Sequence, residues 1–274
     1  MKSAIKKAIF NYRKATWRSR NLPDFMIIGA QKSGTSSLYY YLSQHSQISP
    51  SYVKEVHFFD GGLKPDFDNF KQGQSWYLSH FPRAGKTVKN QKTFDSSPLY
   101  IFNPIVPKRI SEIIPKAKLI AILRNPTERA ISHYFYEKKL GYESLPIMDA
   151  LLAEEERLKP ILEQQDYKHT NFIHFSYKSR GHYYDQIKRY LNYFSMSNIL
   201  FINSAMLFSH PEITLRRVFN FIGVDDDFFV KDLHACNVSQ NRTKVAANIY
   251  EYLDNYYYSQ NHLLYKLIGE NFGW

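Results

Sequence analysis

The chain has 274 residues, of which 44% are hydrophobic and 22% are charged, and its formal net charge is +11. The apolar content is sufficient for a buried core, and the low counts of glycine and proline exclude a collagen-like chain. A single cysteine, Cys236, excludes a disulfide framework and a cysteine-based zinc site. The positive charge favours a polyanionic partner, such as nucleic acid, a phosphorylated ligand, a sulfated glycan or acidic lipid.

The first 22 residues form a basic segment that contains no Asp or Glu. Its apolar residues Ala4, Ile5, Ala8 and Ile9 recur at helical spacing, so it is either a solvated lead-in or a contact with an anionic membrane surface. The segment lacks the apolar stretch of a secretory signal, and no run of the sequence reaches the roughly 18 apolar residues of a membrane span. We therefore expect a cytoplasmic protein in which residues 23–274 form one domain.

Short apolar runs typical of buried strands alternate with helical periods from residue 25 onward. The runs are Phe25–Ile28, Lys118–Leu123 and Ile199–Ile202, with a weaker candidate around Thr93 and Phe94. Helical periods follow the first two runs and flank the third, and the last of these helices begins near Pro211. The alternation predicts an α/β fold, a single domain with a central parallel sheet flanked by helices. Ligands of such sheets bind beyond the carboxyl ends of the strands.

The loop after the first predicted strand reads GAQKSGTSS, from residue 29 to residue 37. A glycine-rich turn that enters a helix presents backbone N–H groups and the positive end of the helix dipole to an anion. The spacing is close to that of a Walker A loop, but the lysine stands before the second glycine, at Lys32, and Thr35 follows Gly34. Lys32 is therefore suited to one anionic group and its leaving oxygen, which counts against a Mg²⁺-dependent nucleotide kinase. A plain strand-to-helix turn is the alternative.

The loop after the second run places Arg124 at the strand end and Pro126 at the start of the next helix. A guanidinium at this place can bind phosphate oxygens through two hydrogen bonds, and Ser132 in the same helix can add a hydroxyl donor. Taken alone, Arg124 is more typical of a surface ion pair. Together with the first loop it indicates a second phosphate site.

These segments resemble sulfotransferases that use 3′-phosphoadenosine-5′-phosphosulfate (PAPS). PDFMIIGAQKSGTSSLYYYL, from residue 23, resembles their 5′-phosphosulfate loop, and LIAILRNPTERAISHYF, from residue 119, resembles their 3′-phosphate element. KEVHFFD, residues 54–60, resembles a segment of the branch that sulfates heparan-type glycans. Shorter similarities follow in order at residues 76–78, 95–100 and 267–274, so that the resemblance covers nearly the whole chain. It implies a P-loop-kinase-like sulfotransferase fold.

The resemblance also implies roles for individual residues. Lys32 would stabilise the bridging oxygen as 3′,5′-ADP departs, and Glu55 corresponds to the general base, with His57 as the competing candidate. The implied cofactor-binding residues are Gln31, Lys32, Ser33, Gly34, Thr35, Ser36, Arg124, Ser132 and, in the basic stretch 241–244, Arg242. The implied cofactor is PAPS, with no metal ion required.

The sequence departs from the glycan branch at residues 95–98, where Asp-Ser-Ser-Pro replaces Glu-Lys-Thr-Pro, so Ser96 stands in place of a lysine that would contact the acceptor or the sulfuryl group. The predicted activity is transfer of a sulfuryl group from PAPS to a hydroxyl or amine of an acceptor, with a carbohydrate favoured over a small molecule or lipid. A basic nucleic-acid-binding module without catalysis is the alternative of another class, and nucleic acid is not the expected partner. Residues 61–73, 141–177 and 180–183 are candidate acceptor loops, and Glu154 to Glu156 are expected on a solvated helix face.

Overall fold

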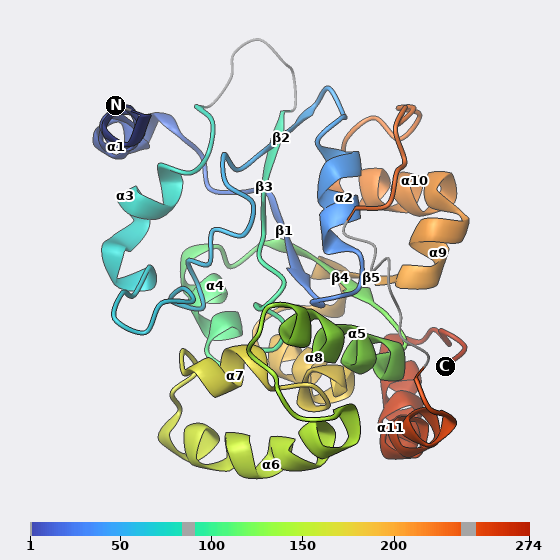
Figure 1. Cartoon of the computed structure of the whole chain (residues 1–274). Coiled ribbons are helices and arrows are strands. Elements are labelled where there is room, and N and C mark those ends of the chain that lie inside the picture. The colour runs from blue at the N-terminus through green and yellow to red at the C-terminus, as the bar shows by residue number, and fades with distance from the viewer. Residues whose placement is uncertain (1, 84–90, 237–244) are drawn as a thin grey trace.

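The computed structural model describes residues 2–83, 91–236 and 245–274 and shows a parallel sheet flanked by helices (Figure 1). The strands in these ranges are β1 (Phe25–Gly29), β2 (Ile48–Pro50), β3 (Lys92–Ser96), β4 (Lys118–Leu123) and β5 (Ile199–Asn203). They pair in the order β2-β3-β1-β4-β5, and every pairing is parallel. The predicted fold class is confirmed. β2 was not predicted, because its three residues are too few to show a period.

Helices connect and cover the strands. Their bounds are α1 (Lys2–Ala15), α2 (Thr35–Leu42), α3 (Gly73–Leu78), α4 (Val106–Ile113), α5 (Pro126–Lys139), α6 (Ile147–Gln164), α7 (Thr170–His174), α8 (Tyr183–Leu191), α9 (Ser204–Ser209), α10 (Pro211–Ile222) and α11 (Ala247–Ile268). The predicted helices after β1 and β4 and on either side of β5 are present. The stretch 141–177, expected to be an acceptor loop, instead contains α6 and α7.

The central strands are buried on both faces, which explains their unbroken apolar sequence. Side chains of one parity, such as Phe25 and Ile27, pack with α2 and α10, whereas Met26 and Ile28 face α4 and α8. All four side chains are at most 1% exposed. The period of two along each strand thus builds one hydrophobic core on either side of the sheet.

The chain reverses its direction across the sheet between β1 and β4. From β1 the chain crosses to the edge strand β2 and returns to β3, which lies beside β1, and β4 then pairs with the opposite edge of β1. This arrangement is the topological switch point at which ligands of open α/β sheets bind. It brings the loop after β1 beside the loop after β4, although nearly 90 residues separate them in the sequence.

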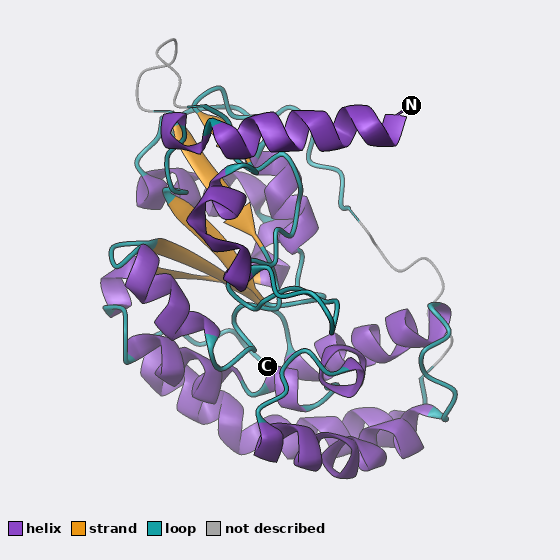
Figure 2. Cartoon of the chain, turned by 90° about the vertical axis from the view of Figure 1, so that its left-hand side faces the viewer, coloured by secondary structure: helices purple, strands orange, loops and turns teal. Residues whose placement is uncertain are grey.

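The basic N-terminal segment forms α1, which lies along one side of the molecule (Figure 2). Phe10 anchors it to the body through ring contacts with Trp76 of α3, at 6.3 Å, and with His80, at 5.3 Å between centroids. In the described residues, none of the helices combines the length and the apolar character needed to traverse a bilayer.

Candidate functional site

The loops after β1 and β4 open into one cavity of about 1660 Å³. Its lining includes Gln31, Lys32, Ser33, Gly34, Thr35, Ser36, Glu55, His57, Arg124 and Ser132, which are all the candidate site residues except Arg242. Arg242 lies outside the described residues. The cavity exceeds the roughly 300–1,000 Å³ of an ordinary ligand pocket, so it has room for two ligands at once.

The loop after β1 turns sharply into α2. Lys32 has a φ of 69° and Gly34 a φ of 103°, both in the left-handed region. The left-handed backbone favours glycine there, and a Cβ at Gly34 would lie 3.0 Å from the ring of Phe208, which would have to shift slightly. Helix α2 begins at Thr35, and the N–H groups of its first turn have no acceptor within the helix. The turn therefore forms an anion cradle at the cavity wall.

Arg124 joins the two loops. Its Nη1 donates a hydrogen bond to the carbonyl oxygen of Lys32, at 3.3 Å, and its Nη2 donates to Glu128, at 2.8 Å. The side chain of Asn125 caps α5 by accepting from the N–H groups of Thr127 and Glu128. The guanidinium therefore lies at the start of α5 while it contacts the backbone of the other loop.

The ammonium group of Lys32 packs against an aromatic ring that the sequence analysis missed. Its Nζ lies 4.2 Å from the ring centroid of Tyr136, which is 41% exposed and lines the same cavity. Burial lowers the pKa of Lys32, and the neighbouring positive charge of Arg124 lowers it further. The π face of Tyr136 favours the charged form. Tyr136 lies one helical turn beyond Ser132, so the period of α5 could have identified it.

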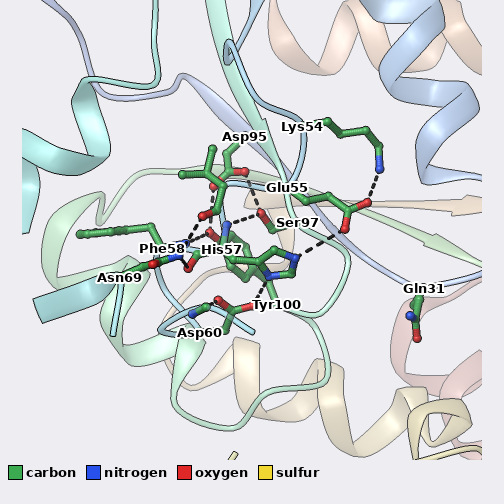
Figure 3. Close-up of polar contacts among 12 residues, drawn as sticks. Gln31, Lys54, Glu55, His57, Phe58, Asp60, Asn69, Asp95, Ser97 and Tyr100 are labelled. Atoms are coloured by element: carbon green, nitrogen blue, oxygen red, sulfur yellow. Dashed lines mark hydrogen bonds and ion pairs between the residues drawn. The ribbon is translucent and has the colours of Figure 1, made fainter. Parts of the chain in front are cut away.

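Glu55 and His57 meet in a chain of charged groups (Figure 3). Glu55 forms an ion pair with Lys54 on one side, and its other carboxylate oxygen lies 3.5 Å from Nε2 of His57. The opposite ring nitrogen, Nδ1, lies 2.6 Å from the buried carboxylate of Asp60. The imidazole of His57 is thus held between two carboxylates.

This arrangement determines the charges of both candidate bases. Burial acts to lower the pKa of His57, but Asp60 and then Glu55 outweigh it and raise that pKa to about 10. Burial acts to raise the pKa of Glu55, but hydrogen bonding with His57 and the charge of Lys54 lower it to about 2. At neutral pH, His57 is an imidazolium with no lone pair to accept a proton, whereas Glu55 is a carboxylate. With these charges, Glu55 is the one of the two candidates that has a lone pair to accept a proton.

Comparison with known proteins agrees with this geometry. The family model described as "Sulfotransferase domain" matches residues 22–271. The chain belongs to the sulfotransferase domain family.

The named relatives include enzymes of the heparan sulfate branch, which the sequence resembles. It is 28% identical to the bifunctional heparan sulfate N-deacetylase/N-sulfotransferase 1 of Caenorhabditis elegans over 92% of this chain and 30% of that protein. It is 24% identical to the membrane-associated sulfotransferase kil1 of Dictyostelium discoideum over 92% of this chain and 66% of that protein. The chain spans less than a third of the length of the N-deacetylase/N-sulfotransferases that it matches.

A solved structure supports the same assignment. The sulfotransferase from Alicyclobacillus acidocaldarius superposes with a TM-score of 0.73 at 29% sequence identity, covering 91% of this chain and 97% of that one. This chain is thus a sulfotransferase related to the heparan sulfate branch, with the sulfotransferase fold.

The sulfotransferase holds Glu55 and His57 on a loop. An extended segment would place both side chains on one side, but Glu55 and His57 have φ values of 63° and 51°, outside the strand region. Ser97 Oγ accepts from the N–H of His57, at 3.1 Å, and Tyr100 OH accepts from the N–H of Phe58, at 2.9 Å. Side chains from the end of β3 and beyond it therefore fix this loop (Figure 3).

The Asp-Ser-Ser-Pro stretch has a structural role that the sequence comparison did not predict. Asp95 is fully buried and accepts from Ser97 and Tyr100, each at 2.9 Å, so it orients the two hydroxyls that hold the loop. Burial raises the pKa of Asp95 to about 6, although its hydrogen bonds oppose the shift. Ser96 is also fully buried, whereas Pro98 and Leu99 reach the cavity. Ser96, which stands in place of the lysine of the glycan branch, is therefore not among the residues that line the cavity.

Arg180 connects the cofactor loop to the helical layer beneath it. This residue is 3% exposed and donates hydrogen bonds to the side chain of Gln31, to Ser176 Oγ at 2.7 Å and to the carbonyl of Phe172 at 2.9 Å. Residue 180 was expected in an acceptor loop, and Arg180 does line the cavity. Its hydrogen-bond donors, however, are taken up by Gln31, Ser176 and backbone carbonyls. Glu154, expected on a solvated face, is 2% exposed and accepts from the N–H of Ser179 at 2.8 Å.

The charge of His57 gives a measurable prediction. Asp60→Asn removes the carboxylate that contributes most to the raised pKa, so we expect the His57 pKa to fall from about 10 toward the usual 6.5. In the wild type, the ion pairing stabilises the fold fully below about pH 6.5, and the contribution is lost as the pH rises to 10. Nitrogen-15 NMR of labelled histidine measures the titration. Asp66→Asn, a change at an exposed carboxylate, is the matched control, and a His57 that titrates near 6.5 in the wild type would contradict the assignment.

Proposed function

We propose that this sulfotransferase transfers the sulfuryl group of PAPS to a hydroxyl or amine of a carbohydrate acceptor by in-line displacement. The observation that carries the proposal is the single cavity lined by the anion cradle, by Arg124 and Ser132 and by the carboxylate of Glu55. A donor site and a proton acceptor thus share a space large enough for two substrates.

These hydrogen-bond donors and cationic groups suit a nucleotide that carries phosphates at both the 5′ and the 3′ positions of its ribose. The cradle at Lys32 to Ser36 would hold the 5′-phosphosulfate, and Arg124 with Ser132 would hold the 3′-phosphate. Gly34 lines the cavity and has no Cβ, so such a group could approach the backbone closely there. The cationic side chains and the helix N-terminus supply the positive charge, so the proposal requires no metal ion.

When bound, PAPS supplies the sulfuryl group and the leaving 3′,5′-ADP. Lys32 would neutralise the charge that grows on the bridging oxygen. The ring of Tyr136 would keep the Lys32 ammonium group directed into the cavity. Glu55 would accept the proton of the attacking hydroxyl or amine at its carboxylate. His57, charged and fixed by Asp60, would orient that carboxylate rather than exchange protons with the acceptor. The chain's own groups thus supply positioning and electrostatic stabilisation, the main requirements of such transfers.

The acceptor class is proposed from the similarity to heparan sulfate enzymes. A second candidate, a small-molecule or lipid acceptor, is favoured by apolar side chains at the cavity, where Leu63 is 45% and Leu140 50% exposed. An acceptor screen with radiolabelled PAPS decides between the two. Label incorporated into desulfated heparan-type chains supports the first, and label found only on alcohols or lipids supports the second.

The donor assignment predicts a binding preference. The protein should bind 3′,5′-ADP more tightly than 5′-AMP in excess EDTA, because only the former has a phosphate for Arg124 and Ser132. Loss of charge-assisted hydrogen bonds lowers affinity by about 10- to 100-fold, so Arg124→Ala should reduce 3′,5′-ADP binding by that factor and leave 5′-AMP binding nearly unchanged. Isothermal titration calorimetry measures both. Equal affinity of the wild type for the two nucleotides would show that the 3′-phosphate site is assigned wrongly.

A further inference from the structure

Helix α1 carries charge of one sign only. Its basic residues are Lys2, Lys6, Lys7, Arg13 and Lys14, and it contains no Asp or Glu. A helix on the surface of a globular protein usually mixes both signs. This helix therefore creates a local positive field beyond the contribution of the rest of the surface.

One face of α1 is occupied by the body of the protein. Phe10 contacts Trp76 and His80, and the guanidinium of Arg13 lies 3.6 Å from the ring centroid of Tyr52. Figure 2 shows the helix lying along the molecule with its N-terminal end extending beyond the neighbouring elements. Ile5 and Ile9 lie on a side of α1 that these contacts leave exposed, and Tyr12 follows on the same side, where its OH accepts a hydrogen bond from Nη2 of Arg83 at 2.6 Å.

The exposed side of α1 carries apolar residues. Ile5 is 53%, Ile9 45% and Tyr12 57% exposed, and their spacing of four and three residues places them on one side of the helix. We call Ile5, Ile9 and Tyr12 the exposed stripe. Lys6 flanks it, and it is exposed as well. Single exposed apolar residues are common in soluble proteins, but an aligned set on a purely basic helix is not.

The two properties together select one kind of partner. Nucleic acid would use the positive charges but would leave the isoleucines in water. A protein groove would take the isoleucines without requiring a helix free of acidic residues. The surface of an anionic bilayer does both, since its headgroups attract Lys and Arg and its interface takes up apolar side chains. The tyrosine at one end of the stripe also suits the headgroup level.

We propose that α1 binds the surface of anionic membranes, with the exposed stripe inserted among the headgroups and Lys6 in contact with lipid phosphates or carboxylates. The helix lies in the plane of the interface and does not cross the bilayer. The proposal is independent of the catalytic assignment, because it involves no residue of the cavity.

Sedimentation with sucrose-loaded vesicles tests the proposal on the full chain. We expect binding to vesicles of phosphatidylcholine with phosphatidylserine, little binding to pure phosphatidylcholine, and a decline as salt is raised. Ile5→Ser with Ile9→Ser should lower the partition coefficient by about tenfold or more, because apolar burial contributes most of the insertion. Lys6→Gln with Lys7→Gln should lower it by a smaller factor that disappears at high salt.

The matched control is Leu152→Ser with Leu162→Ser on α6, where the two leucines are 57% and 45% exposed. This pair removes a similar exposed apolar area and should leave vesicle binding unchanged, with sulfotransfer or 3′,5′-ADP binding as a check of folding. The proposal is overturned if the serine pair on α1 binds vesicles as the wild type does. It is also overturned if the exposed stripe mediates dimers in size-exclusion chromatography while vesicles capture none of the protein.

Discussion

Lys32→Ala should lower kcat/KM for sulfuryl transfer by about 10²–10³, the usual effect of removing one preorganised donor to a developing negative charge. The ammonium group lies over Tyr136 at the wall of the cavity and close to Arg124, where burial strengthens its interaction with a leaving oxygen. Since the α2 N-terminus and Arg124 remain, affinity for 3′,5′-ADP should change much less than turnover. Steady-state kinetics together with calorimetry separate the two effects.

The control for this variant is Lys108→Ala, a change at a lysine whose side chain is 66% exposed on α4. It removes an equal charge away from the cavity and should preserve turnover. A Lys32→Ala enzyme with the kcat/KM of the wild type would remove Lys32 from the reaction.

Glu55→Gln should lower kcat by about 10²–10⁴, the contribution of a positioned general base. The amide keeps the size of the side chain but cannot take the acceptor proton. Its binding of 3′,5′-ADP should be nearly unchanged, because the donor loops are intact. Glu112→Gln, at a side chain 54% exposed on α4, is the matched control.

His57→Gln should cost less than Glu55→Gln, because the imidazolium orients the carboxylate and does not accept the proton. The opposite order, with turnover abolished at residue 57 and mildly reduced at residue 55, would identify histidine as the base. The wild-type pH profile gives an independent check. With His57 titrating at about 10 and Glu55 at about 2, no limb near pH 6.5 should arise from either group.

The sequence was sufficient to predict the sheet where burial imposes a pattern. β1 and β4 are apolar throughout because both faces are covered, and Pro126 and Pro211 begin helices as their fixed φ favours. In α6, the Glu154–Glu156 run was expected on a solvated helix face, and Glu155 and Glu156 are exposed. Glu154 is in fact buried, since it satisfies backbone N–H groups that no local pattern reveals.

The candidate site likewise has parts that the sequence could predict and parts that depend on tertiary contacts. The residues of the loops after β1 and β4 are contiguous in sequence, so their residue types alone suggested anion binding, and the structure places both loops at one cavity. The charge states of Glu55 and His57 depend on Asp60 and Lys54. The loop that carries them is held by hydrogen bonds from its N–H groups to Ser97 and Tyr100, some 40 residues away. Glu55 and His57, neither of which is glycine, have left-handed φ values that tertiary contacts likewise impose. Sequence could name these candidate bases but not choose between them.

The hydrogen bond from Arg124 to the backbone of Lys32 has a consequence for donor selection. A phosphate bound at the ribose 3′ position would hold the guanidinium, and the guanidinium holds the carbonyl of Lys32, the residue proposed to stabilise the leaving group. Recognition at one end of the donor is thereby linked mechanically to the reacting end. Binding energy from a remote group is then expressed in turnover as well as in affinity. A donor without that phosphate would therefore bind more weakly and would also react more slowly once bound.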